Sequence, residues 1–313
     1  MEALNDPHLK LFLFFSSLKI LYIIIDICNK KMFNKKMVFK KIINDPYKVV
    51  DEMVEGIVLA HSDLLKFANN NKRAVIRKDA PIKDKVGILI GGGSGHEPAF
   101  LGYVGKGLAD AAAIGNVFAS PSPDPIVEAT KAISAGMGVV YMYGNYAGDI
   151  MNFDMAAEIC QMEGIPIKTV LVTDDIASAP LNKKNERRGV AGDFYVFKIA
   201  GAAADVGMEL DDVCRLAEKA NDMTISMGVA LGPCSLPHTL EPSFVLEDNE
   251  MEIGLGIHGE AGVRKGNLQS ADEITTELMD KILNEMGNSK KVSVLINGLG
   301  STPLMELYIM YRK

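Results

Sequence analysis

The chain has 313 residues, 48% of them hydrophobic, which is enough for one large domain or two smaller ones with a substantial core. Charged residues make up 23%, the net charge is −7 and there is no tryptophan; an acidic chain without a basic stripe argues against a nucleic-acid partner. The four cysteines are scattered, without the spacing of a metal or redox site, as is typical of a protein in the reducing cytoplasm.

The first part of the chain contains one membrane-like stretch, residues 11–27. A spanning helix needs about 20 apolar residues, and here Lys19 would lie near the middle and Asp26 near one end, where charges are costly. Acidic residues precede the stretch, which is unlike a signal peptide. A membrane anchor and a signal peptide are the alternatives, but we interpret residues 1–40 as a non-native or dispensable extension, with regular structure starting after Met37.

Helical and strand patterns then alternate. Helices are predicted from an N-cap at Asp45 to His61, at about 121–134, 150–163, 193–206, 211–223 and 271–286, and from 303 onward. Strands are predicted at 74–78, 86–90, 139–143, 167–173, 228–232, 251–258 and 291–297. This alternation indicates an α/β fold with a largely parallel sheet, and the polar stretch 174–190 is a predicted loop and domain boundary.

The most distinctive motif is GGGSGHEP at 91–98, directly after a strand predicted to be buried on both faces. It delivers His96 to the carboxyl edge of the sheet, where open α/β sheets bind ligands. The dinucleotide fingerprint and the hydrolase nucleophile elbow, with Ser94 as nucleophile, would both need glycine in place of His96. No phosphate-binding P-loop is present. A structural turn with an incidental histidine is the alternative.

Two further glycine-flanked turns carry candidate residues. Residues 144–149, GNYAGD, end a predicted strand and place Asp149 at the start of a helix, where it also fits an N-cap. Residues 254–260, GLGIHGE, leave His258 accessible. Two histidines and an aspartate suit proton transfer on a hydroxyl and nucleophilic capture of a carbonyl. The chain lacks clustered carboxylates for a metal and a cradle for nucleotide phosphates.

Seven motifs in order make the sequence similar to the K subunit of dihydroxyacetone kinases over about residues 40–313. They are IINDP (42–46), GGGSGHEPAF (91–100), SPSPD (120–124), NYAGDIMNF (145–153), RRGVAG (187–192), MEIGLGIHGE (251–260) and NGLGSTPLMELY (297–308). The resemblance implies a cytoplasmic homodimer with two α/β domains. The first, residues 41–185, would contain the largely parallel sheet, and the second, residues 186–313, would be smaller.

The resemblance also implies roles for individual residues. His258 would bond covalently through its ring nitrogen to the ketone carbon of a small ketose, forming a hemiaminal. His96 and Asp149 would contact the hydroxyl that is phosphorylated, as general base and orienting group. The turn formed by Gly93, Ser94, Gly95 and His96 would complete the pocket.

The phosphoryl donor is implied to lie elsewhere. No cofactor is expected in this chain, because ATP or ADP with magnesium belongs to a separate L subunit or domain. In phosphotransferase-linked systems an M subunit recharges the L-bound ADP from phosphoenolpyruvate.

Three features depart from the family pattern. Gly144 stands where the family commonly has lysine, which leaves room for a longer ketose such as erythrulose and makes Gly144 a candidate substrate-contacting position. Residues 176–186 differ from the expected loop. Relatives are also expected to continue a few dozen residues past the last helix, so the chain is expected to be C-terminally truncated.

Two other functions are alternatives. An α/β hydrolase would use Ser94, Asp149 and His258, which occur in that fold's chain order. A non-catalytic relative would bind ketose through the same histidine and act on a transcription regulator. Neighbouring genes for L and M subunits would favour the kinase, and a regulator gene alone would favour the sensor.

Overall fold

The structure is a computed structural model that describes residues 41–69, 71–239, 241–287 and 290–313. The extension that we predict at residues 1–40 lies outside the described residues. Within the described ranges, no helix is long and apolar enough to cross a membrane.

Residues 235–242 belong to a separate compact unit, which carries an antiparallel bridge between Ser235 and Pro242. All helices and strands described below belong to the other unit, residues 43–234 and 243–313.

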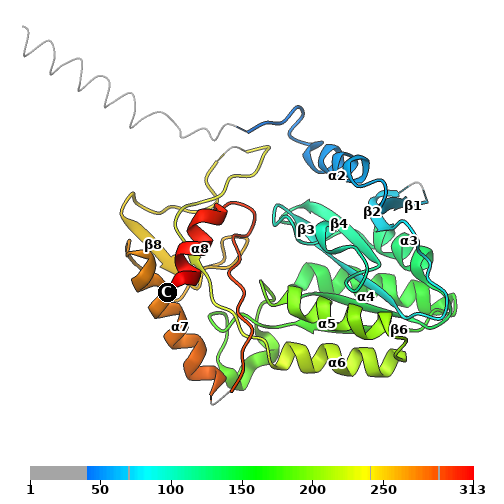
Figure 1. Cartoon of the computed structure of the whole chain (residues 1–313). Helices are drawn as coiled ribbons and strands as arrows, with labels where there is room; N and C mark the ends of the chain where they lie inside the picture. Colours follow the sequence, from blue (N-terminus) through cyan, green and yellow to red (C-terminus); the bar gives the residue numbers. More distant parts are fainter. Residues whose placement is uncertain (1–40, 70, 240, 288–289) are drawn as a thin grey trace, which may run out of the picture. The chain divides into compact units, whose positions relative to one another are not determined.

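The largest element of that unit is a six-stranded sheet with the order β1-β2-β4-β3-β5-β6 (Figure 1). The pairings of β3 with β4, β3 with β5 and β5 with β6 are parallel, whereas β2 pairs antiparallel with both neighbours. The sheet is therefore largely parallel, as predicted. Its strands are β1 (Leu65–Ala68), β2 (Asn71–Arg77), β3 (Gly87–Ser94), β4 (Ala111–Val117), β5 (Val139–Gly144) and β6 (Ile167–Val172).

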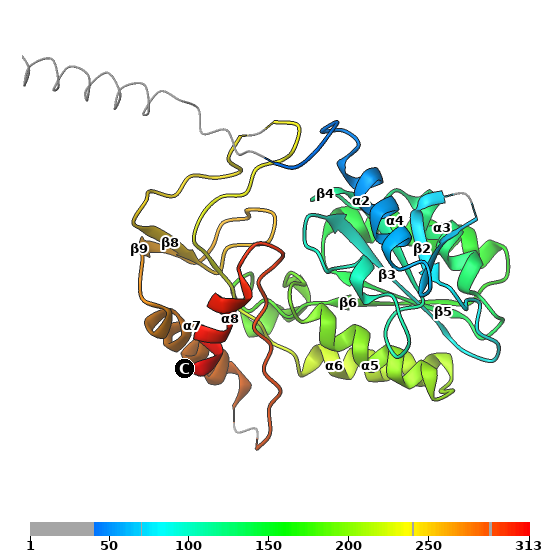
Figure 2. The same cartoon turned by 45° about the horizontal axis from the view of Figure 1, so that its top comes forward.

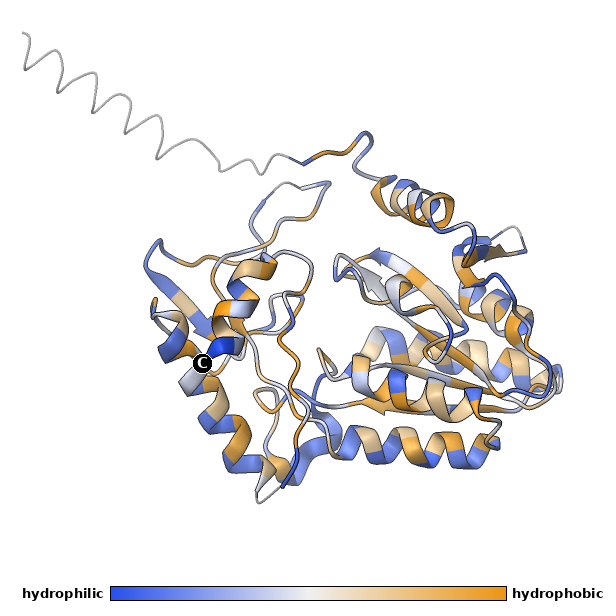
Figure 3. Ribbon diagram, in the orientation of Figure 1, coloured by the Kyte–Doolittle hydropathy of each residue, from blue (hydrophilic) through white to orange (hydrophobic). Residues whose placement is uncertain are grey.

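Helices cover both faces of this sheet. One face packs against α2 (Val49–Ala60), α5 (Asp193–Asp205) and α6 (Leu210–Asp222), and the other against α3 (Pro123–Ile133) and α4 (Ala147–Met162). In β3 the side chains alternate between the faces, so Ile88 and Ile90 join the first core and Leu89 the second. Helix α6 buries Val213, Cys214, Ala217 and Ala220, and the alternating colours along it in Figure 3 reflect this one-sided pattern.

The order of the strands positions the site. Central strand β3 lies between β4 and β5 and runs parallel to both, so the loops that follow all three emerge at one edge of the sheet. These loops carry His96 after β3, Phe118 after β4 and Tyr146 after β5.

A second, three-stranded antiparallel sheet follows α6. It contains β7 (Val229–Ala230), β8 (Glu250–Ile253) and β9 (Arg264–Asn267), and it packs with α7 (Ala271–Met286) around a small apolar core (Figure 2). Helix α7 starts where predicted because Ser270 and Glu273 form a reciprocal capping box. The last helix is α8 (Leu304–Arg312), with Pro303 at its N-cap.

Three predicted elements differ from the structure. The strand predicted at 251–258 ends at Ile253. Residues 291–297 are not a strand, since no described strand pairs with them, and the Ser293 hydroxyl instead bonds the Tyr195 hydroxyl on α5 at 2.6 Å. The first helix starts at Val49 rather than after Asp45, because the Asp45 side chain accepts the backbone N–H of Tyr47 and closes a preceding turn.

Two short 3-10 helices complete the unit, η1 (Leu101–Tyr103) and η2 (Leu181–Glu186), the second of which lies within the predicted loop 174–190. The domain boundary that we predict between residues 185 and 186 stays a prediction. Helices α5 and α6, which follow it, pack on the six-stranded sheet.

Candidate functional site

The two histidines singled out by their glycine-flanked turns meet in the structure. His96 follows β3 and His258 follows β8, and their Nε2 atoms lie 3.1 Å apart. His96 is buried, whereas His258 is partly accessible. Burial and the neighbouring charge of His258, opposed by that of Glu260, lower the pKa of His96 to about 4, so the His96 ring is neutral at physiological pH.

Glu260 decides which nitrogen of His258 carries the proton. Its Oε1 lies 2.9 Å from Nδ1 of His258, and its Oε2 accepts the His258 backbone N–H at 3.0 Å. Burial alone would raise the pKa of Glu260, but the hydrogen bonds with His258 lower it to about 2, so the carboxylate is ionised. An ionised carboxylate only accepts, so we assign the proton of neutral His258 to Nδ1. Nε2 then keeps a free electron pair, and His96 donates to it.

The turn around His258 is shaped to hold this carboxylate. A Cβ at Gly256 would lie 2.2 Å from Oε2 of Glu260 and 2.4 Å from Nη1 of Arg188, so only glycine allows both to approach. Arg188 binds the Gly254 carbonyl at 3.1 Å and pairs with Asp175 at 2.8 Å. These bonds tie the turn after β8 to the loop after β6.

Aromatic rings enclose the histidine pair. Phe118 stacks on His96 with ring centroids 5.0 Å apart, and Tyr146 meets His258 edge-on at 4.9 Å. Phe118 has a φ of 56°, an uncommon conformation for a bulky residue that is found preferentially at functional sites. Gly95 makes room for it, because a Cβ there would lie 2.7 Å from the Phe118 ring.

Asp149 supplies a buried carboxylate in the first turn of α4. It is not the helix cap, a position held by Tyr146, and its Oδ1 is buried without a hydrogen-bond partner in the described part of the chain. Burial raises the pKa of Asp149 to about 6, opposed by the nearby Ser120 hydroxyl and by His258. A carboxylate of this kind can accept a proton near neutral pH.

The structure speaks against the hydrolase alternative. Ser94 is 3% exposed, and its hydroxyl donates to the Gly115 carbonyl at 2.9 Å. It therefore holds β3 to β4 and is not presented as a nucleophile.

Known proteins similar to this chain come from one family. The Dak1 domain family matches residues 55–313. The chain belongs to the Dak1 family. Among Dak1 relatives, it is 50% identical over 276 residues to the dihydroxyacetone-binding subunit DhaK of PTS-dependent dihydroxyacetone kinase 2 from Listeria innocua, covering 88% of this chain and 83% of that protein. It is 43% identical to the L-erythrulose kinase of Pectobacterium atrosepticum, covering 86% of this chain and 46% of that protein.

Solved Dak1-related structures share the fold. The dihydroxyacetone kinase of C. freundii matches with a TM-score of 0.81 and 36% identity over 87% of this chain and 50% of that one. The dihydroxyacetone kinase operon co-activator Dha-DhaQ matches with a TM-score of 0.75 and 36% identity, over 84% of this chain and 81% of that one. The chain thus spans about half the length of the erythrulose kinase and of the C. freundii kinase.

The structure brings some of the predicted site residues together and adds neighbours that the sequence analysis did not name. His96 and His258 are in contact, and Asp149 lies where the charge of His258 acts on its carboxyl group. Three neighbours were missed. Glu260 had a signal, since it lies two residues after His258 in the same turn, whereas Phe118 and Tyr146 become recognisable only once the rings are placed.

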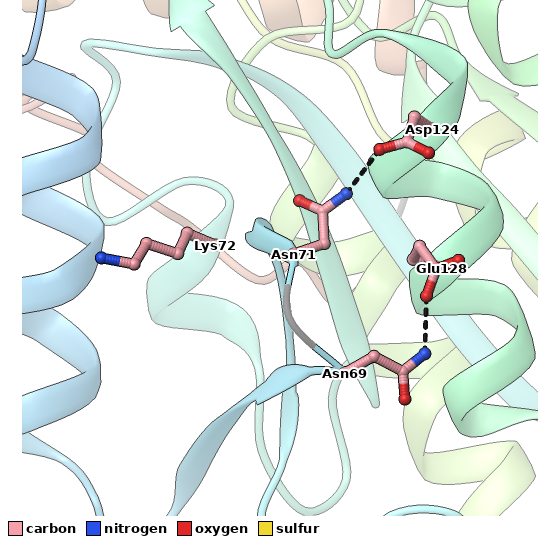
Figure 4. A pocket seen from close by; sticks show the side chains of 5 residues that line it. All are labelled: Asn69, Asn71, Lys72, Asp124 and Glu128. Atoms are coloured by element: carbon pink, nitrogen blue, oxygen red, sulfur yellow. Dashed lines mark hydrogen bonds between the residues drawn. The ribbon is translucent and has the colours of Figure 1, made fainter.

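A separate surface hollow of about 670 Å³ lies away from these residues (Figure 4). Its polar side chains bond one another: Asn71 donates to Asp124 at 2.8 Å and Asn69 to Glu128 at 2.6 Å. These bonds join β2 and its neighbouring turn to α3. The hollow contains none of the chemistry described above, so we assign it no function.

Proposed function

We propose that this Dak1 chain is the ketose-binding subunit of a dihydroxyacetone-type kinase and captures its substrate covalently on His258. The observation that carries the proposal is the arrangement of Glu260, His258 and His96. Glu260 holds the proton on Nδ1, and the opposite nitrogen of the same ring faces a buried, neutral histidine. A nucleophile oriented by a third group is the usual architecture of covalent catalysis.

In the proposed addition, Nε2 of His258 attacks the ketone carbon and forms the new N–C bond. The carbonyl π electrons become a lone pair on oxygen, which takes a proton from solvent to give the hydroxyl of the hemiaminal. The ring is left with a positive charge, which the ionised Glu260 beside Nδ1 offsets. The approaching ketone displaces His96 from Nε2, so the His96 N–H becomes free to donate to a substrate oxygen.

Asp149 then serves the transfer step. The resemblance implies His96 as general base and Asp149 as orienting group; we propose the reverse, because the pKa of His96 is about 4 and its Nε2–H donates to His258. The unpartnered Oδ1 of Asp149 accepts the proton of the substrate hydroxyl as that oxygen attacks phosphorus, and His96 orients the hydroxyl. In this proposal the chain itself holds no cofactor. The phosphoryl group comes from ATP, or from ADP recharged through an M subunit, with magnesium on a partner L subunit. We further infer a cytoplasmic homodimer.

The relatives support the kinase and leave the sensor as an alternative. The Listeria innocua protein named as a dihydroxyacetone-binding subunit is 50% identical. Among the solved structures, the C. freundii kinase and the co-activator Dha-DhaQ are both 36% identical. Dihydroxyacetone is accordingly the first substrate to test. Erythrulose is the second, since the L-erythrulose kinase is 43% identical.

The test is a mixing assay. The isolated chain is expected neither to bind ATP tightly nor to phosphorylate either ketose. Adding an L subunit with ATP, or an L subunit with the phosphoenolpyruvate chain, should start turnover. Micromolar ATP affinity of the isolated chain by calorimetry, or the absence of turnover with both donor systems, would contradict the proposal.

Gly144 gives a prediction about substrate size. A Cβ at Gly144 would lie 3.0 Å from the Tyr146 ring, which itself contacts His258. Gly144→Lys should therefore crowd the pocket wall and shift relative affinity from erythrulose toward dihydroxyacetone. Calorimetry with both ketoses measures this, with Gly105→Lys as the control because a Cβ there meets nothing within 4 Å. An unchanged ratio of affinities would remove Gly144 from the substrate-contacting residues.

A further inference from the structure

A second buried carboxylate lies close to the proposed site without a role. Asp193 is the first residue of α5 and is 6% exposed. Its Oδ1 is buried and has no hydrogen-bond partner among the described residues. Burial raises the pKa of Asp193 well above its ordinary value, and the charges of Asp174 and Asp149 raise it further.

A structural role at the helix start does not account for this side chain. Acidic residues are favourable in the first turn of a helix, but there they normally face solvent or bond backbone N–H groups. Asp174, which is also buried, has the hydrogen bonds expected of a structural carboxylate. It accepts the backbone N–H groups of Val190 and Gly192, each at 2.8 Å, and the hydroxyl of Ser226. Asp193 has no comparable set, and a buried polar group without a partner is costly.

The position of Asp193 connects it to the ketose site. A Cβ built on Gly189 would lie 3.1 Å from Oδ1 of Asp193 and 2.5 Å from Cα of Gly144, so the carboxyl lies where the backbones of Gly189 and Gly144 meet. The carbonyl oxygen of Gly189 accepts a hydrogen bond from the hydroxyl of Tyr146 at 3.0 Å. Tyr146 in turn packs edge-on against His258.

The contacts that connect Asp193 to His258 run through two intermediate residues. Asp193 lies against Gly189, the Gly189 carbonyl accepts the Tyr146 hydroxyl, and the Tyr146 ring packs on His258. Both hydroxyls of a three-carbon ketone are two bonds from the carbon that His258 would hold. A partner separated from His258 by Gly189 and Tyr146 is suited to a hydroxyl further along the sugar, which a ketose of four carbons has.

We propose that Asp193 is a further substrate-binding residue, which hydrogen-bonds a hydroxyl that dihydroxyacetone lacks and so favours a four-carbon ketose such as erythrulose. The proposal rests on the proposed capture of ketoses at His258. It accounts for the buried, unpartnered oxygen, because the substrate supplies the missing partner. A site built to bond a hydroxyl discriminates against the ligand without it, since its own polar group then stays unpaired.

The experiment compares dissociation constants of erythrulose and dihydroxyacetone by calorimetry. Asp193→Ala should weaken erythrulose binding by about 10- to 100-fold, the range for a hydrogen bond to a charged or strongly polar group, and leave dihydroxyacetone within about threefold. Asp193→Asn, which keeps a hydrogen-bonding group of the same shape, should retain part of the preference. The control is Asp212→Asn, an exposed acid in the first turn of α6.

The outcomes of this experiment distinguish failure of the role of Asp193 from failure of the proposed ketose capture at His258. Equal loss of both ketoses in Asp193→Ala, or an unchanged ratio of their dissociation constants, would overturn the role of Asp193 while leaving capture at His258 intact. A wild-type chain that binds neither ketose would instead overturn the proposed function, and this inference with it. The unfolding temperature of Asp193→Ala should match or exceed that of the wild type, because a buried carboxyl without a partner is removed. A large drop in that temperature would assign Asp193 a structural role instead.

Discussion

Replacing His258 with alanine should abolish the covalent adduct with dihydroxyacetone and weaken binding by on the order of 100-fold, or about 2.7 kcal/mol. The reason is that Nε2 of His258 carries no proton, so its electron pair can attack the ketone carbon. Nε2 of His96 carries a proton and cannot do so. Intact mass spectrometry measures the adduct, which should add the whole mass of the ketone because addition to a carbonyl expels no water. Calorimetry measures the affinity.

The matched control for this variant is His61→Ala, an exposed histidine at the end of α2. It should bind ketone and form the adduct as the wild type does. His96→Ala should keep some adduct, since it removes a neighbour of the nucleophile and not the nucleophile. An adduct that survives in His258→Ala would assign the bond to another residue.

Replacing Asp149 with asparagine should separate capture from transfer. The adduct should persist, while turnover with the partner subunit should fall by about 10²–10⁴-fold, the range for a lost general base. Because the pKa of Asp149 is about 6, the wild-type rate should decline as pH falls through that value, where the carboxylate becomes protonated. The decline should be missing in Asp149→Asn. An inflection near pH 6 that remains in the variant would identify another group as the base.

The same variant should be more stable than the wild type. Folding raises the pKa of Asp149 from 3.8 to about 6, so the native state loses stability as pH rises between these values. Above pH 6 the cost is fully present, and at 1.36 kcal/mol per pKa unit its removal should raise the free energy of unfolding by up to about 3 kcal/mol at pH 8. Denaturant titration tests this, with Asp154→Asn, exposed on the same helix, as the control.

The fold was predictable from the sequence where local signals agree with packing. Helix α7 has a capping box and a periodic apolar face, and it spans the predicted residues. Strand β4 was missed because Ala111, Ala112 and Ala113 have low strand propensity; they form a strand since both faces are buried under helices. Residues 291–297 show the reverse case, with strand-forming side chains and no paired neighbour among the described strands.

The site was predictable to the extent that glycines mark it. His96 and Asp149 follow the parallel strands β3 and β5 after glycine-rich turns, and parallel strands bring such turns to one edge. His258 follows β8 of the antiparallel sheet, so this rule does not explain its place beside His96. Phe118 was not identified, because its role depends on turn geometry that no local pattern encodes. Glu260 had a local signal in its place two residues after His258, but its hydrogen bond to Nδ1 of that histidine is visible only in the structure. Asp193 resembles an ordinary acid at a helix start, and only its burial without a partner sets it apart.

The central claim is that the ketone carbon bonds to Nε2 of His258, and one measurement tests it directly. Dihydroxyacetone labelled with ¹³C at its ketone carbon is bound to protein labelled with ¹⁵N in its histidines and observed by NMR. We expect the ketone carbon to leave the carbonyl region of the spectrum and to show a one-bond coupling to a histidine ring nitrogen that is absent from His258→Ala. A carbon that stays in the carbonyl region at saturation, or that couples to a nitrogen still present in His258→Ala, would contradict the claim.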